Sequence, residues 1–214
     1  SPFPKISNLQ LLSDIQVRCC SLYYNIYILY LIYLALTIIE LIALLIAQMP
    51  WFDAVCISIG TAGTGGFGIL NSSVASYSVA AQWIITIFMI IFAINFNAYY
   101  LILFGQAKKA FKMEEVRAFL LFVTTAIILI TIDIHRLFGN VFDALTHAAF
   151  QVASLVSSTG FATTDFNVWP GFSKTILVLL MFIGACAGST GGGVKVSRFV
   201  IMGKAIFNEL LSYI

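Results

Sequence analysis

The sequence predicts an all-α membrane protein in which one helical unit occurs twice in tandem. Three observations favour this fold class. Of the 214 residues, 61% are hydrophobic and 9% are charged, and the mean hydropathy is +1.01, whereas a soluble domain carries about 25% charged residues. Several apolar stretches are long enough to cross a bilayer, and a glycine-containing motif recurs along the chain. This composition excludes a soluble enzyme and a nucleic-acid-binding protein.

Four stretches fit transmembrane helices, because about 20 apolar residues cross a hydrocarbon core of about 30 Å. They lie at 19–49, 79–104, 117–133 and 173–200. The third stretch is short, but Arg117 can snorkel to one interface and Asp133 can lie among the headgroups at the other. Residues 1–18 precede the first span, and we predict that they form a cytoplasmic N-terminal segment.

Two shorter apolar segments do not fit as spans, because each ends in a loop rich in Gly, Ser and Thr instead of a charged flank. These segments are 51–63 and 141–157. As a helix, the first would be about 20 Å long, which is too short to cross the hydrocarbon core. We predict that both are re-entrant helices, which enter the membrane and return on the same side.

The basic residues indicate how the chain is oriented. If the four spans alternate, one side receives nine of the eleven Lys and Arg residues, and the other receives only Arg136 and Lys174. By the positive-inside rule, the first side is cytoplasmic. The re-entrant helices then enter from the outside, where Asp53, Asp143 and Asp165 form an acidic rim that attracts cations.

The chain also contains an internal repeat. Residues 51–55 read WFDAV and residues 141–145 read VFDAL, and a Gly-Phe step follows each of them. Setting Gly66 on Gly160 gives an offset of 94 residues and aligns the helices that follow without a gap. The unit is therefore span, re-entrant helix, loop and span. We predict a first repeat at 19–107 and a second repeat at 108–214.

The two loops after the re-entrant helices, 64–68 and 158–162, carry the predicted chemistry. Non-helical backbone at membrane depth is tolerated only where it is buried in protein or lines a wet path. Glycine adopts positive φ angles that turn successive carbonyls toward one axis, where they can replace the hydration shell of a cation. The negative ends of the short helices would point to the same place.

These properties predict a cation-selective filter in two parts. Its residues are Thr64, Gly65, Gly66, Phe67, Ser158, Thr159, Gly160 and Phe161. The alternative is that the glycines only allow close packing between helices. The filter is favoured because the pattern occurs twice, each time between a short helix and a full span.

The motifs resemble a known family. Residues 151–172, QVASLVSSTGFATTDFNVWPGF, and 182–198, FIGACAGSTGGGVKVSR, closely resemble the third repeat of the TrkH-type bacterial potassium uptake proteins, in the superfamily that includes KtrB and the plant HKT transporters. Residues 58–68, SIGTAGTGGFG, and 93–100, AINFNAYY, resemble the second repeat. The resemblance implies four potassium-channel-type repeats around a pseudo-fourfold axis, of which this chain would supply half.

The resemblance also implies a gate, formed by a flexible loop that interrupts the last helix of the third repeat below the filter. The matching residues are Gly188, Ser189, Thr190, Gly191, Gly192 and Gly193. Each glycine weakens a helix by about 1 kcal/mol relative to alanine, so this segment is a candidate for a bistable element. The alternatives are a close-packed crossing of small residues and a simple helix C-cap.

The expected function is potassium uptake across the bacterial inner membrane by a multi-pass protein that is not an enzyme. K+ would be the transported ion, bound by filter carbonyls alone, with no covalent or tightly bound cofactor. The resemblance implies a homodimer in the lipid bilayer and a cytoplasmic nucleotide-binding regulatory subunit of the TrkA type. Two loops cannot encircle an ion, so missing repeats or another pore chain must complete the ring. The ends at Ser1 and Ile214 favour a fragment.

Two other functions are considered. A secondary transporter with broken helices around a midplane site predicts inverted repeats, whereas these repeats run in the same direction. A serine hydrolase would need a histidine base beside Ser189, but His135 and His147 are predicted on the opposite side of the membrane. The sequence assigns no role to five further polar residues, which are Glu40, Asn95, Asn97, Lys195 and Arg198.

Overall fold

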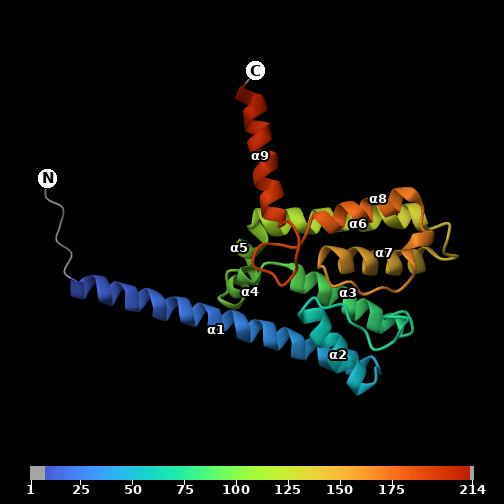
Figure 1. Cartoon of the computed structure of the whole chain (residues 1–214), viewed down its shortest axis with the longest axis horizontal. Helices are drawn as coiled ribbons and strands as arrows, with labels where there is room; N and C mark the ends of the chain where they lie inside the picture. Colours follow the sequence, from blue (N-terminus) through green and yellow to red (C-terminus); the bar gives the residue numbers. More distant parts are fainter. Residues whose placement is uncertain (1–7, 213–214) are drawn as a thin grey trace.

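The computed structural model describes residues 8–212, with side chains from 26 to 211, as a helical body from which α1 and α9 project (Figure 1). Within this range the regular structure is helical except for one isolated bridge between Ile183 and Val194. The predicted all-α class is confirmed. The helices are α1 (Asn8–Ile46), α2 (Trp51–Ala62), α3 (Val79–Ala93), α4 (Phe96–Leu103), α5 (Ala107–Lys112), α6 (Glu114–Ile134), α7 (Val141–Val156), the 3-10 helix η1 (Phe166–Val168), α8 (Gly171–Phe182) and α9 (Val196–Ser212).

The first helix begins earlier than the sequence predicts. Helix α1 begins at Asn8, so it includes most of the predicted segment 1–18, of which residues 1–7 lie outside the described part of the chain. Its stretch Ile26–Ile46 and helix α6 are each long and apolar enough to cross a membrane. The two short helices occupy 51–62 and 141–156, within the segments for which re-entrant helices are predicted.

The predicted span 79–104 is not one continuous helix. Helices α3 and α4 meet at an angle of 91° and could form a third span only as a bent pair. The chain leaves the helical conformation at Ile94 and Asn95. The side chain of Asn95 then accepts a hydrogen bond of 2.9 Å from the backbone N–H of Asn97. This N-cap provides a partner for one of the free N–H groups at the start of α4 and allows a new helix to begin.

The predicted span 173–200 is interrupted over a longer stretch than 188–193. Helix α8 ends at Phe182 and α9 begins at Val196, so residues 183–195 form a non-helical segment, here called the glycine loop. Its two ends lie against each other, because the N–H of Gly184 donates to the carbonyl of Val194 at 2.9 Å. A Cβ on Gly184 would lie 2.1 Å from the carbonyl oxygen of Gly192, so this crossing requires glycine.

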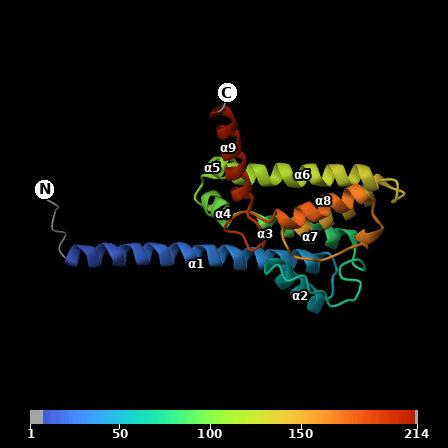
Figure 2. The same ribbon diagram turned by 45° about the horizontal axis from the view of Figure 1, so that its top comes forward.

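The body consists of two packed groups of helices, and the main helix contact between them joins α3 to α7. Helices α1, α2 and α3 pack together, as do α6, α7 and α8, and α3 lies along α7 between the groups (Figure 2). At this junction the indole N–H of Trp83 donates to the hydroxyl of Thr146 at 3.2 Å, and buried Phe150 and Phe161 pack with Ile85. The junction brings the ends of the two short helices close together.

Candidate functional site

The two loops that follow the short helices have the same backbone conformation. Thr64 and Gly66 have φ angles of 51° and 69°, and Ser158 and Gly160 have φ angles of 61° and 87°. These are the positions that the 94-residue offset aligns. A positive φ is uncommon for a residue other than glycine, and for β-branched Thr64 it is a genuine outlier. Such strain persists where the surrounding structure fixes it, and it is concentrated at functional sites.

The N–H groups of these loops point back to the short helices. The N–H of Gly65 donates to the carbonyl of Gly60 at 2.7 Å, and the N–H of Thr159 donates to the carbonyl of Ser154 at 2.9 Å. Among residues 26–211, whose side chains are described, no group donates a hydrogen bond to the peptide oxygens of 64–66 or 158–160. Except at Gly66, the N–H groups of 64–66 and 158–160 therefore donate to the short helices, while the carbonyl oxygens of these residues have no donor among the residues whose side chains are described.

The two loops touch each other. A Cβ on Gly66 would lie 1.9 Å from the carbonyl oxygen of Thr159, whereas a Cβ on Gly160 would have open space around it. Behind them, the ring of Phe161 is fully buried and lies against Gly60. The structure thus brings the two predicted filter loops into contact, and the side chain of Phe67 is 86% exposed.

The glycine loop lies directly against both of these loops. The N–H of Gly192 donates to the hydroxyl of Ser158 at 2.8 Å, and the hydroxyl of Thr64 donates to the carbonyl of Thr190 at 3.4 Å. A Cβ on Gly191 would lie 2.5 Å from the Cβ of Ala185. The predicted gate residues and the predicted filter residues are therefore in direct contact, and glycine is required where the chain segments approach most closely.

The glycine loop also binds the break between α3 and α4. The N–H of Cys186 donates to the carbonyl of Ala93 at 3.0 Å, and the N–H of Phe96 donates to the carbonyl of Gly188 at 3.0 Å. A helix end leaves backbone groups without intrahelical partners. Here the interrupted helices of the two repeats supply partners for each other, at the level where the repeat alignment places both breaks.

Three polar residues at this contact have roles that sequence reasoning did not assign. The carboxylate of Glu115 accepts hydrogen bonds from the N–H of Ala187 at 2.5 Å and from the side-chain amide of Asn95 at 3.4 Å. The ammonium group of Lys195 donates to the carbonyl of Gly191. No sequence signal identifies Glu115, since it follows the basic residues of 108–112 and resembles a solvated helix start. By contrast, Asn97 and Arg198 are exposed.

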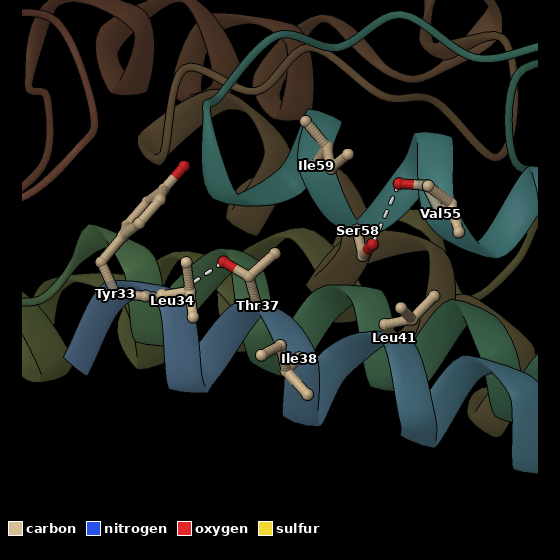
Figure 3. A pocket seen from close by; sticks show the side chains of 8 residues that line it. All are labelled: Tyr33, Leu34, Thr37, Ile38, Leu41, Val55, Ser58 and Ile59. Atoms are coloured by element: carbon tan, nitrogen blue, oxygen red, sulfur yellow. Dashed lines mark hydrogen bonds between the residues drawn. The ribbon is translucent and has the colours of Figure 1, made fainter. Parts of the chain in front are cut away.

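An apolar groove lies between α1 and α2 on the side away from α7. Its volume is about 320 Å³. Figure 3 shows its lining side chains, which are Tyr33, Leu34, Thr37, Ile38, Leu41, Val55, Ser58 and Ile59. Trp51, Phe52 and Ile59 of α2 are exposed beside it. The residue of α7 that aligns with Phe52 is Phe142, whose ring contacts Trp83 of α3 although 55% of the side chain is exposed.

The remaining titratable groups do not form a catalytic or metal site in the described part of the chain. The hydroxyl of Ser189 donates to the carbonyl of Cys186 at 2.6 Å, whereas His147 interacts with the hydroxyl of Thr163 at 3.0 Å. No cluster of three His, Cys, Asp or Glu side chains suited to a metal ion occurs within residues 26–211, whose side chains are described. Glu40 is fully buried beside Thr61, and neither of its oxygens has a hydrogen-bond partner among the described residues.

These features define a class of protein. Two tandem units, each with a long helix, a short helix, a glycine-containing loop and an interrupted helix, form a helical membrane protein whose two loops meet at the junction between the units. The chain belongs to the TrkH family, described as cation transport proteins, and the family model matches residues 7–211. Membership places the chain among membrane transport proteins, not among enzymes.

Two named proteins are similar to this chain in sequence. The chain is 36% identical over 179 residues to the Trk system potassium uptake protein TrkH of Salmonella typhimurium. This match covers 82% of this chain and 37% of the relative. It is 37% identical to TrkH of Vibrio parahaemolyticus over 78% of this chain and 36% of that protein.

The fold is similar to the crystal structure of the potassium transporter TrkH from Vibrio parahaemolyticus, with a TM-score of 0.81 and 33% identity. The match covers 88% of this chain and 42% of that chain. The chain thus spans between a third and a half of the length of these relatives.

Proposed function

We propose that this chain forms half of a potassium-selective pore in a bacterial inner membrane. The peptide oxygens of 64–66 and 158–160 would bind a dehydrated K+ ion, and the glycine loop would control its passage. One observation carries this proposal: two aligned loops share an unusual backbone, lie in contact with each other and have carbonyl oxygens that accept no hydrogen bond from the residues whose side chains are described.

The chemistry of ion binding follows from this arrangement. A ring of carbonyl oxygens can replace the hydration shell of an alkali cation. The C-terminal ends of α2 and α7, which lie next to the loops, carry partial negative charge. Asp53 and Asp143, in the first turns of these helices, would raise the local concentration of cations at the outer entrance.

The ring would be completed by further repeats, from the same protein or from another pore chain. The groove between α1 and α2 supports this, because the corresponding short helix of the second repeat, α7, packs along α3 of the preceding repeat, whereas α2 has no such neighbour among the described residues. The side chain of Phe67 supports it as well. Its counterpart Phe161 is buried against Gly60 of the neighbouring repeat, whereas Phe67 is exposed and needs an equivalent partner.

The glycine loop would act as the gate because it contacts both filter loops from below and continues directly into α9. A movement of α9 on the cytoplasmic side would then be transmitted to the loop. This arrangement suits a homodimer regulated by a cytoplasmic nucleotide-binding subunit of the TrkA type, which would approach α9 and the basic helix α5.

The test is Rb+ and K+ flux through the complete protein in liposomes, comparing the wild type with Gly160→Ser. A side chain at Gly160 has open space, so the main effect is strain at φ 87° on the filter backbone. We expect reduced flux and weaker discrimination between K+ and Na+.

Gly105→Ser is the matched control, because Gly105 also has a positive φ and open surroundings but lies far along the chain from the filter. Unchanged flux and discrimination in Gly160→Ser would reject the filter.

A secondary transporter is the second candidate, because the two helix breaks contact each other as broken helices do around a midplane site. Exchange experiments separate the two functions. A secondary transporter would accelerate the exit of labelled ion when unlabelled ion is added to the other side, whereas a pore would not.

A further inference from the structure

Glu115 is the point at which three separate segments meet. It lies in the first turn of α6, and its two carboxylate oxygens accept from different segments: Oε1 from the N–H of Ala187 in the glycine loop, and Oε2 from the amide of Asn95 in the α3–α4 break. The carboxylate therefore links the break of the first repeat to the loop of the second.

The orientation of Asn95 makes this link specific. Its Oδ1 accepts from the N–H of Asn97 at 2.9 Å, which leaves the Nδ2 group to donate to Glu115. Both groups that face Glu115 are consequently donors. An ionised carboxylate is the side chain that accepts from two donors at once, whereas a glutamine amide would present one acceptor and one donor.

The surroundings make the contact to Ala187 important for the loop. The neighbouring Ala185 and Cys186 are fully buried, and Asn95 is 7% exposed. A short hydrogen bond to a carboxylate is stronger than one between neutral groups. If the carboxylate is removed, the N–H of Ala187 loses its partner in a largely buried setting, which favours displacement of the loop.

We propose that Glu115 is a positioning residue that holds the glycine loop against the α3–α4 break and thereby sets how often the loop leaves the filter. The inference rests on the proposed function in one respect, since the effect on flux requires that the loop is the gate. The holding contact itself can be tested without flux.

The variants are Glu115→Asp, Glu115→Gln and Glu115→Ala in the complete protein. Aspartate keeps the charge but is one methylene shorter, so it cannot span both donors. Glutamine keeps one acceptor and loses the second contact. The matched control is Glu114→Gln, because Glu114 is the adjacent carboxylate but is exposed and pairs with Lys204 of α9 instead of the loop.

The first measurement is the rate at which N-ethylmaleimide modifies Cys186, in a protein whose Cys19, Cys20 and Cys56 are replaced by serine. Cys186 is buried in the loop, so its modification reports displacement of the loop. We expect the rate to rise about tenfold in Glu115→Ala, which loses both contacts, and less in Glu115→Asp and Glu115→Gln, each of which can keep one acceptor, as the loss of a charge-assisted hydrogen bond implies. Glu114→Gln should behave like the wild type.

The second measurement is Rb+ flux in the same variants, without a regulatory subunit. A rise in flux that parallels the labelling would support both the contact and the gate. Faster labelling with unchanged flux would support the contact and reject the glycine loop as gate. Unchanged labelling in Glu115→Asp and Glu115→Gln would overturn the inference. A flux that falls only in Glu115→Gln and Glu115→Ala would also overturn it, because that outcome would mean that only the charge of Glu115 matters.

Discussion

The two repeats agree in their loops and differ in their broken helices. Both loops have left-handed residues at aligned positions and return their N–H groups to the preceding short helix. The break in the first repeat is confined to Ile94 and Asn95, whereas the break in the second covers 183–195. On the proposed function, the two equivalent loops would bind the ion and the single long break would control the path.

The local chemistry explains why the breaks differ. In the first repeat, the side chain of Asn95 caps α4 and restarts the helix at once. In the second repeat, glycines allow the chain to cross itself at Gly184 and Gly192 and to form a separate loop. A short break keeps both halves of a helix in fixed relation, whereas a long break can be displaced as a unit.

The largest effect is expected from Gly66→Ala, which tests whether the two loops are equally constrained. The new Cβ would lie 1.9 Å from the carbonyl oxygen of Thr159 at a φ of 69°. Overpacking and left-handed strain together are expected to lower the free energy of unfolding by about 2–5 kcal/mol. If the distorted filter raises the barrier to ion passage by about 2.7 kcal/mol, the K+ flux falls about 100-fold. Flux in liposomes and thermal aggregation in detergent measure both effects.

Gly160→Ala is the matched variant in the second repeat. It has open space around the new Cβ and meets only backbone strain of about 1–2 kcal/mol. The two alanine variants should therefore differ clearly in stability. If they lose stability equally, the direct contact between the loops is not a determinant of the structure.

Deletion of Gly191, Gly192 and Gly193 tests whether the long break is the gate. The shortened loop could no longer reach Ser158, so the path below the filter would open and flux would rise by about tenfold, the equivalent of about 1.4 kcal/mol. Discrimination between K+ and Na+ should persist, because both filter loops remain. Flux at or below the wild-type value would contradict the assignment of the gate.

Ser158→Ala and Thr64→Val compare the two contacts between the glycine loop and the filter loops. The bond to Ser158 is 2.8 Å long and the bond to Thr64 is 3.4 Å long, so the first should contribute more. Loss of the Ser158 contact leaves the N–H of Gly192 unpaired, at about 1 kcal/mol, and should raise basal flux by about fivefold. A larger rise in Thr64→Val would reverse the order that the distances predict.

The smallest effect is expected from Tyr77→Phe, which removes a hydrogen bond of 2.7 Å from the tyrosine hydroxyl to Asp53 at the start of α2. The free energy of unfolding should fall by about 1 kcal/mol, whereas Asp143→Asn at the aligned, exposed position of α7 should have a smaller effect. Thermal aggregation of the purified protein provides the measurement.

The stabilisation that the hydrogen bond from Tyr77 to Asp53 provides depends on pH through the pKa of Tyr77. Burial, followed by the hydrogen bond to Asp53, raises the pKa of Tyr77 to about 12. The pKa of the folded state therefore exceeds the value of about 10 in an unfolded chain. The stabilisation is fully present below pH 10 and declines as the pH rises toward 12. The difference between Tyr77→Phe and the wild type should stay constant from about pH 6 to about pH 9.

The sequence predicts the fold class because hydrophobicity is a property of each segment. Apolar length predicts a span within 19–49 and another at 117–133, and short apolar segments before glycine loops predict α2 and α7. Apolar length fails at 79–104, which contains no charged residue. Nothing in that stretch except Asn95 indicates a bend of 91°, because the bend depends on partners in the glycine loop.

The candidate filter could be predicted from the sequence because the same glycine-containing loop follows a short apolar segment in both repeats. The contact network around it was not. Glu115 and Ala187 are 72 positions apart, and Phe92 and Thr190 are 98 positions apart. No periodic pattern in the sequence indicates that such distant residues are in contact. The sequence also does not distinguish a carboxylate that binds a loop from one that is exposed at the start of a helix. The sequence therefore places Glu114 and Glu115 together, whereas the structure separates an exposed ion pair from a contact to the loop.

By itself, the sequence determined that this chain is helical, lies in a membrane and repeats one unit after 94 residues, because composition, apolar length and glycine spacing act locally. The tertiary structure decided where the helices break and which groups bind the glycine loop. The physical reason is that each exposed N–H or carbonyl at a helix break needs a partner, and only the packing of α3, α6 and the glycine loop shows which residue provides it.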